Sequence, residues 1–195
     1  MTGQPVVVVL HDDNLPENMD SVAAQAEVRY ATADALGDAV PGADVLLLWD
    51  FFSPAVKRVW DRCTSLQWIH IAAAGVDSLM FDDLVESDVV VTNSRGVFDR
   101  PIAEFVLGQI LAFAKDSAHS AALQSRRVWE HRETERIDTA HAMIVGTGAI
   151  GRETARILKA VGMTVSGVGR TYRTHDADFG VVHASSDVAQ VVHDV

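Results

Sequence analysis

The chain has 195 residues, which corresponds to one or two domains and is enough to bury a hydrophobic core without a disulfide or metal staple. Hydrophobic residues make up 48% of it and charged residues 22%, which excludes a disordered chain, a collagen-like chain and a coiled coil. The net charge of -11 disfavours binding to a phosphate backbone, so we expect no nucleic-acid partner. The single cysteine, Cys63, excludes an intrachain disulfide and a cysteine-built zinc site.

The first hundred residues alternate strand-like and helix-like segments. Short apolar runs predict buried strands at 6–10, 45–49, 68–71 and 89–91. Segments of helical length separate them at 19–26, 54–63 and 79–87. This alternation predicts βαβ units that form a parallel sheet.

A different pattern begins at Pro101. Apolar residues on more than one side of the segment 101–118 predict a helix that is buried from two sides. Such a helix is either a plain core helix or one that lies between domains or subunits. After a polar stretch at 126–138, a second strand–helix–strand pattern is predicted, with strands at 142–145 and 163–168, a helix at 149–161 and a short third strand at 180–183.

A G-x-G-x-x-G match, Gly146-Thr147-Gly148-Ala149-Ile150-Gly151, follows the strand at 142–145 and opens the next helix. In this context the motif predicts a dinucleotide-binding turn. Gly146 would permit the tight turn, Gly148 would leave room for the pyrophosphate, and Gly151 would let the helix pack closely. The helix N-terminus would offer its free N–H groups to the phosphates. A glycine turn without a ligand is the alternative.

The end of the next strand bears on the choice of cofactor. It reads Val168-Gly169-Arg170-Thr171 and has no acidic residue for a ribose 2′-OH. Arg170 and Thr171 could instead bind a 2′-phosphate, which favours NADP over NAD. Alternatively, Arg170 is a solvated surface charge and either cofactor binds. Asp176 and Asp178 lie too far along the chain to be the usual ribose ligand.

Three stretches carry a resemblance to a known family. They are Ala73-Ala74-Gly75-Val76-Asp77, then residues 92–98 with Pro101-Ile102-Ala103-Glu104, and the glycine turn as far as Arg152. In order and spacing they resemble the D-isomer-specific 2-hydroxyacid dehydrogenases, which include glyoxylate/hydroxypyruvate reductases. The resemblance extends over nearly the whole chain.

The resemblance implies an α/β fold with two parts. A flavodoxin-like parallel-sheet substrate lobe would occupy 1–99, and 100–195 would contain the interdomain helix and the N-terminal half of a Rossmann NAD(P)-binding domain. Backbone N–H groups of Ala74, Gly75 and Val76 would bind a substrate carboxylate. A tight turn without a ligand is the alternative for this loop. The helix at 101–118 would form a homodimer.

The implied function is an NAD(P)-dependent oxidoreductase that interconverts a small 2-keto acid and a D-2-hydroxy acid by hydride transfer. The family's catalytic Arg, Glu and His fall beyond Val195, so the chain resembles a C-terminally truncated member. We therefore predict no catalytic residue in these 195 residues and no activity from them alone. The alternative is an inactive remnant that binds nucleotide or dimerises.

The remaining expectations concern histidines, metals and location. His70 is the only histidine near the loop at 73–77, and we expect it to be a packed strand residue. No spacing of His, Asp and Glu suggests a metal site. The sequence shows no signal peptide or membrane-spanning segment, so we expect a cytoplasmic protein without a membrane partner.

Overall fold

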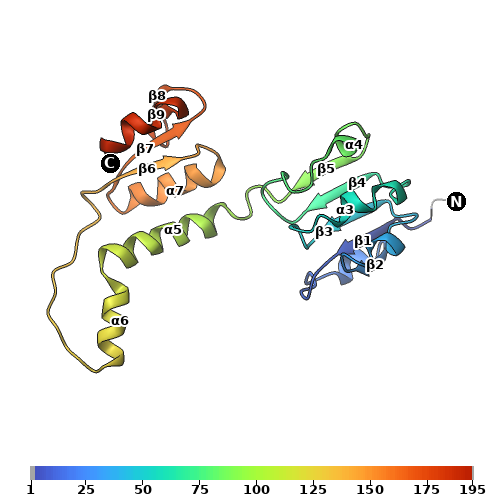
Figure 1. The fold of residues 1–195 in the computed structure, drawn as a ribbon, viewed down its shortest axis with the longest axis horizontal. Coiled ribbons are helices and arrows are strands. Elements are labelled where there is room, and N and C mark those ends of the chain that lie inside the picture. The colour runs from blue at the N-terminus through green and yellow to red at the C-terminus, as the bar shows by residue number, and fades with distance from the viewer. Residues whose placement is uncertain (1–2, 195) are drawn as a thin grey trace. The chain divides into compact units, whose positions relative to one another are not determined.

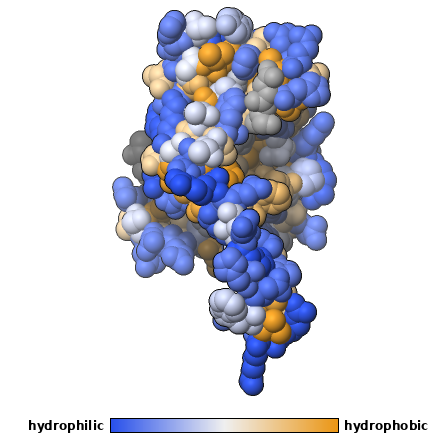
Figure 2. All heavy atoms as spheres, turned by 90° about the vertical axis from the view of Figure 1, so that its left-hand side faces the viewer, coloured by the Kyte–Doolittle hydropathy of each residue, from blue (hydrophilic) through white to orange (hydrophobic). Residues whose placement is uncertain are grey.

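The computed structural model describes residues 3–194, and the chain divides into two compact units, Met1–Arg95 and Gly96–Val195 (Figure 1). The predicted division after residue 99 stays a prediction. Among the described residues, none of the helices has the length and apolar character needed to cross a bilayer. The face drawn in Figure 2 is mostly hydrophilic, with hydrophobic residues in small groups.

The first unit is built on a five-stranded parallel sheet. Its strands are β1 (Val6–Leu10), β2 (Glu27–Ala31), β3 (Val45–Leu48), β4 (Trp68–Ile71) and β5 (Val90–Asn93), in the order β2-β1-β3-β4-β5. This is the flavodoxin-like order, and it confirms the predicted fold class. Short helices connect the strands: α1 (Asp20–Ala23), α2 (Leu36–Ala39), α3 (Ala55–Arg58) and α4 (Asp82–Val85).

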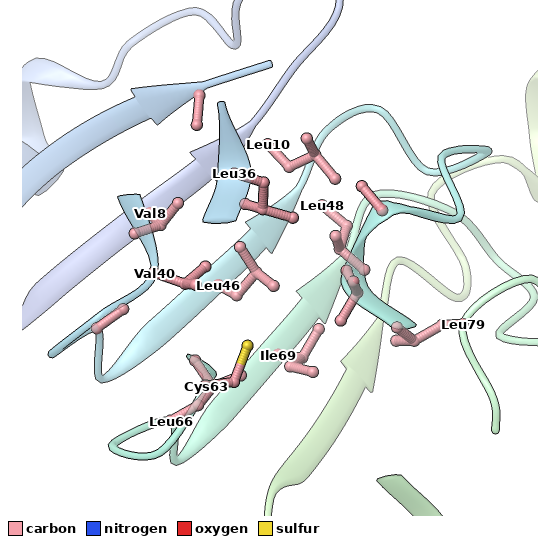
Figure 3. Close-up of a cluster of buried hydrophobic side chains, with 14 of the residues drawn as sticks. Val8, Leu10, Leu36, Val40, Leu46, Leu48, Cys63, Leu66, Ile69 and Leu79 are labelled. Atoms are coloured by element: carbon pink, nitrogen blue, oxygen red, sulfur yellow. The ribbon is translucent and has the colours of Figure 1, made fainter. Parts of the chain in front are cut away.

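The larger of two hydrophobic clusters in the first unit lies on one face of this sheet. Leu10, Leu46 and Ile69 point from neighbouring strands toward Leu36 and Cys63 (Figure 3). Because the side chains of a strand alternate between faces, the intervening residues of β1 point the other way, where they pack with the residues around α1. Burial on both faces explains why β1 and β3 are continuous apolar runs.

The second unit contains three longer helices, a four-stranded sheet and a short helix near its C-terminal end. Its elements are α5 (Asp99–Ala114), α6 (Ser117–Ser125), β6 (His141–Val145), α7 (Ala149–Ala160), β7 (Thr164–Gly169), β8 (Arg173–Asp176), β9 (Gly180–Ala184) and α8 (Val188–Val191). The sheet order is β6-β7-β9-β8; the first three strands are parallel and β8 is antiparallel to β9. The helix α7 packs between the sheet and α5 (Figure 1).

The prediction of one continuous helix over 101–118 is wrong. The helix α5 ends at Ala114, and Asp116 adopts a left-handed conformation with φ 48° before α6 begins. Arg132 forms an ion pair with Asp116, so this break is also a point of contact with the long loop that follows α6. Pro101 lies in the first turn of α5, where a missing N–H is tolerated.

Candidate functional site

The glycine turn lies between β6 and α7, as the motif predicts. Gly146 has φ +110°, a conformation that side chains rarely adopt, and its N–H donates to the Val168 carbonyl of β7 at 2.9 Å. Gly148 is the N-cap of α7, and its carbonyl accepts from Arg152 N–H at 2.9 Å. The turn is therefore anchored to the neighbouring strand on one side and to the helix on the other.

The other two glycines differ in what surrounds them. A Cβ on Gly151 would lie 2.0 Å from the carbonyl oxygen of Gly146, so only glycine lets α7 approach the turn this closely. A Cβ on Gly148 would have no atom within 4 Å, so the space beside this residue is open. This geometry matches the reason given for each glycine, while their contact with a cofactor stays a prediction.

Two further features make the turn suitable for a dinucleotide. The first N–H groups of α7 have no acceptor within the helix, and the helix dipole adds partial positive charge there. Val145, the last residue of β6, has 74% of its surface exposed. The turn thus presents unpaired helix N-terminal amides next to an uncovered apolar side chain.

The end of β7 lies against the turn. A Cβ on Gly169 would lie 2.9 Å from Thr147 Oγ1, so the turn and the strand end touch at this glycine. Arg170 follows directly and is exposed, and its side chain makes no hydrogen bond or ion pair with any residue from 3 to 194. Sequence reasoning placed Arg170 and Thr171 beside the glycine motif, and the structure brings both segments together.

A network of charged side chains joins α7 to the hairpin of β8 and β9. Arg152, the residue after the third motif glycine, donates to both carboxylate oxygens of Asp176, at 3.0 and 3.1 Å, and to Asp178 at 2.8 Å. Arg156 donates to Asp178 at 2.9 Å, and Arg173 donates through Nε to Asp176 at 2.8 Å. The two aspartates therefore bind arginines from the helix and from the hairpin.

These contacts stabilise the ionised carboxylates. The Arg152 guanidinium holds the pKa of Asp176 and of Asp178 below the ordinary range, with smaller contributions from Arg173 and Arg156 respectively. The Asp176 side chain is only 6% exposed. Sequence reasoning missed this network, because pairing across 24 residues leaves no local spacing signal.

The loop predicted to bind a carboxylate follows β4 in the first unit. Its carbonyls are occupied, because Ser94 N–H donates to Ala73 and Asn93 Nδ2 donates to Ala74. The N–H groups of Ala74, Gly75 and Val76 have no acceptor among the described residues. Anchored carbonyls and free successive amides are what an anion-binding loop requires.

His70 lies on β4, and both of its ring nitrogens are engaged. Nδ1 lies 2.8 Å from Thr92 Oγ1, and Nε2 lies 3.2 Å from Ser94 Oγ. The ring is thus held by β5 and the residue after it. Within residues 3–194, no group of three or more His, Cys, Asp and Glu side chains is arranged to hold a metal ion.

Comparison with known proteins agrees with these observations. Residues 107–194 match the model of the NAD binding domain of D-isomer specific 2-hydroxyacid dehydrogenases. The D-3-phosphoglycerate dehydrogenase of Methanocaldococcus jannaschii is 26% identical over 168 residues, which is 83% of this chain and 32% of that protein. The chain therefore spans about a third of this curated relative.

Two solved structures resemble both units. One is a D-isomer specific 2-hydroxyacid dehydrogenase family protein from Aeromonas salmonicida, with a TM-score of 0.79 and 27% identity, covering 97% of this chain and 61% of that one. Another is the NADPH-dependent glyoxylate/hydroxypyruvate reductase of Sinorhizobium meliloti in complex with NADP and sulfate, with a TM-score of 0.71 and 23% identity, covering 96% and 58%. The resemblance first seen in the sequence motifs is confirmed.

Proposed function

Because residues 107–194 match the model of the NAD binding domain of D-isomer specific 2-hydroxyacid dehydrogenases, we propose that the protein is part of an oxidoreductase that interconverts a small 2-keto acid and a D-2-hydroxy acid. The observation that carries this proposal is the glycine turn, where Gly151 lets α7 approach the turn and Gly148 leaves open space. The nicotinamide supplies the hydride in such a reaction, and the protein binds and orients the reactants.

In this proposal the turn residues Gly146, Thr147, Gly148, Ala149, Ile150 and Gly151 hold the pyrophosphate. The amides at the N-terminus of α7 donate to the phosphate oxygens. The loop of Ala74, Gly75 and Val76 holds the carboxylate of the keto acid through its unpaired N–H groups. NADP is the preferred cofactor, because Arg170 is an uncommitted cation beside the turn and Gly169 offers no carboxylate to a ribose.

Titration of the 195-residue chain with NADP and with NAD tests the cofactor proposal. We expect saturable binding of both and tighter binding of NADP. Arg170→Gln should reduce the difference, whereas Arg58→Gln, an exposed arginine of the first unit, should leave it unchanged. A folded chain that binds neither nucleotide would contradict the proposed function, and an Arg170→Gln variant that keeps the preference would contradict the choice of NADP.

The carboxylate site is tested separately. Backbone amide resonances of Ala74, Gly75 and Val76 should shift when glyoxylate is added, and the uncharged methyl ester of glyoxylate should not shift them. Shifts confined to other loops would contradict this assignment.

We further propose that the 195 residues alone turn over no keto acid, because they contain no counterpart of the implied catalytic Arg, Glu and His. NADPH oxidation above background by the purified chain would disprove this.

We also propose homodimer formation through α5. Leu107 and Ile110 of this helix pack against the core of the second unit and Ala103 is fully buried, while Phe105 and Phe113 are 66% and 86% exposed. Two exposed phenylalanines on one helix favour a protein interface over a solvated surface. Sedimentation should show a dimer for the natural chain and a monomer for Phe105→Asp. A monomeric natural chain at micromolar concentration would contradict the proposal.

A further inference from the structure

Arg173 is a second arginine in the segment that follows β7, and only the Nε of its guanidinium has a hydrogen-bond partner among the described residues. It begins β8, three residues after Arg170, so both arginines border the same short connection from β7. Its Nε donates to Asp176 Oδ2 at 2.8 Å. Across residues 3–194 its two terminal amino groups make no hydrogen bond, and its side chain is 36% exposed. A fork of donors therefore remains available at this point.

The carboxylate that holds Arg173 is fixed from several directions. His175 has φ +60°, and the pairing of β8 with β9 shifts register between Thr174 and Asp176. Such a bulge turns the following side chain to a new direction. Asp176 Oδ1 accepts from the backbone N–H of Asp178 at 3.0 Å and of Phe179 at 3.3 Å.

Arg152 connects this carboxylate to the glycine turn. Its two bonds to Asp176 come from the first turn of α7, one residue after the last motif glycine. Its guanidinium also lies 5.5 Å from the centre of the Phe179 ring, which is 1% exposed. Because Asp176 is bound to both the helix and the hairpin, its Oδ2 atom presents a fixed acceptor to Arg173.

We propose that Asp176 is a positioning residue for cofactor selection: it holds Arg173 so that its terminal amino groups, together with Arg170, bind the 2′-phosphate of NADP. This inference rests on the proposed NADP preference. A 2′-phosphate carries close to two negative charges and several acceptor oxygens, so one arginine does not satisfy it. An arginine already oriented by a carboxylate loses less conformational entropy when it binds.

The test compares two small probes that differ only in the 2′-phosphate, 2′,5′-ADP and 5′-AMP, by calorimetric titration of the 195-residue chain. The measured quantity is the ratio of their dissociation constants, which a general loss of fold would not change selectively. Arg173→Gln should lower the preference for 2′,5′-ADP by about tenfold, the usual effect of one charge-assisted contact. Asp176→Asn should lower it as well, although Arg173 is still present.

The substitution at Asp176 has a matched control. Asparagine at 176 keeps an oxygen for the N–H groups of Asp178 and Phe179 but loses the charge that holds Arg173. Asp178→Asn removes a carboxylate that pairs with Arg152 and Arg156 but not with Arg173, so the probe ratio should stay at the natural value. A ratio that falls equally in both aspartate variants would overturn the inference.

The remaining outcomes separate this inference from the proposed function. If the natural chain binds neither probe, the proposed function fails. If Arg170→Gln lowers the ratio while Arg173→Gln and Asp176→Asn do not, only the role of Asp176 fails. If Asp176→Asn does not fold, Arg173→Lys replaces it, because lysine keeps the charge but lacks the fork that can bind Asp176 and a phosphate together. An unchanged ratio in Arg173→Lys would then overturn the inference.

Discussion

Replacing Gly151 with alanine should separate the packing role of the glycine turn from its binding role. The added Cβ would lie 2.0 Å from the Gly146 carbonyl oxygen and 3.4 Å from Ile144 Cγ2. A normal C···O contact is about 3.3 Å. The helix α7 and the turn must therefore move apart until the added Cβ no longer overlaps the carbonyl oxygen. Because the clash is with backbone, we expect a cost near the upper end of overpacking, about 3 kcal/mol.

Hydrogen exchange measured by mass spectrometry gives the local stability of each unit separately. At about 1.4 kcal/mol per tenfold, peptides of β6 and α7 should exchange about 100-fold faster in Gly151→Ala. Peptides of β1 and β3, in the first unit, serve as the internal reference and should not change. If β6 and α7 keep their natural protection, the close approach of helix and turn does not require a glycine at 151.

Gly148→Ala is the matched control. Its Cβ would meet no atom within 4 Å, and its φ of -77° suits alanine, so protection of the second unit should be unchanged. The methyl group would instead occupy the space assigned to the pyrophosphate, so nucleotide affinity should fall by tenfold or more, about 1.4 kcal/mol. Unchanged affinity in a folded Gly148→Ala variant would show that the cofactor does not approach this glycine.

Three further outcomes are expected. Gly169→Asp should shift the cofactor preference toward NAD only when combined with Thr147→Ala, because a Cβ at 169 would lie 2.9 Å from Thr147 Oγ1. Titration of the single and the double variant with NAD and NADP measures this shift, and equal shifts in the two variants would contradict the importance of the contact. The arginines lower the pKa of Asp176 and Asp178, so these ion pairs stabilise the fold fully above the ordinary carboxyl pKa and lose that contribution as pH falls below about 4 through the lowered values. Exchange protection of the second unit should therefore decline below about pH 4, and it should decline less steeply in Asp176→Asn. Burial raises the pKa of Cys63 to about 11, so a thiol reagent at pH 8 should label it only as fast as the first unit opens, and rapid labelling of the native chain would refute this.

The sequence predicted the strands and helices whose pattern is strongest. Buried parallel strands such as β1 and β3 are continuous apolar runs, and α7 combines a glycine start with an amphipathic stripe. The strands β2 and β8 lie at sheet edges and escaped prediction because they lack an apolar run. Their sequences, Glu-Val-Arg-Tyr-Ala and Arg-Thr-His-Asp, carry charged residues that exposed edges tolerate.

The break between α5 and α6 also had no clear signal. Aspartate is a residue that can adopt a left-handed conformation, but nothing in the local pattern distinguishes Asp116 from an ordinary helical position. Its partner Arg132 lies in a polar loop 16 residues later, so the contact depends on tertiary structure. Local propensity alone could not place the end of α5.

For the candidate site, the sequence placed the backbone features and missed the side-chain network. Glycine spacing reports directly on conformation, so the motif located Gly146 and Gly151 with their roles. The partners of Arg152 could not be predicted, because a bulge at His175 decides where the Asp176 carboxylate points. Motifs record what the backbone must do, whereas ion pairs between distant segments depend on the folded arrangement.

The strand order of the first unit has a consequence for how the protein is made. Its five strands all come from the first 95 residues, and β3, β4 and β5 are added to one edge in the order in which they are synthesised. A ribosome therefore releases every strand of this sheet before it begins β6 of the second unit. Since domains generally fold as units from the N-terminus during synthesis, the first sheet can fold while the glycine turn is still being translated.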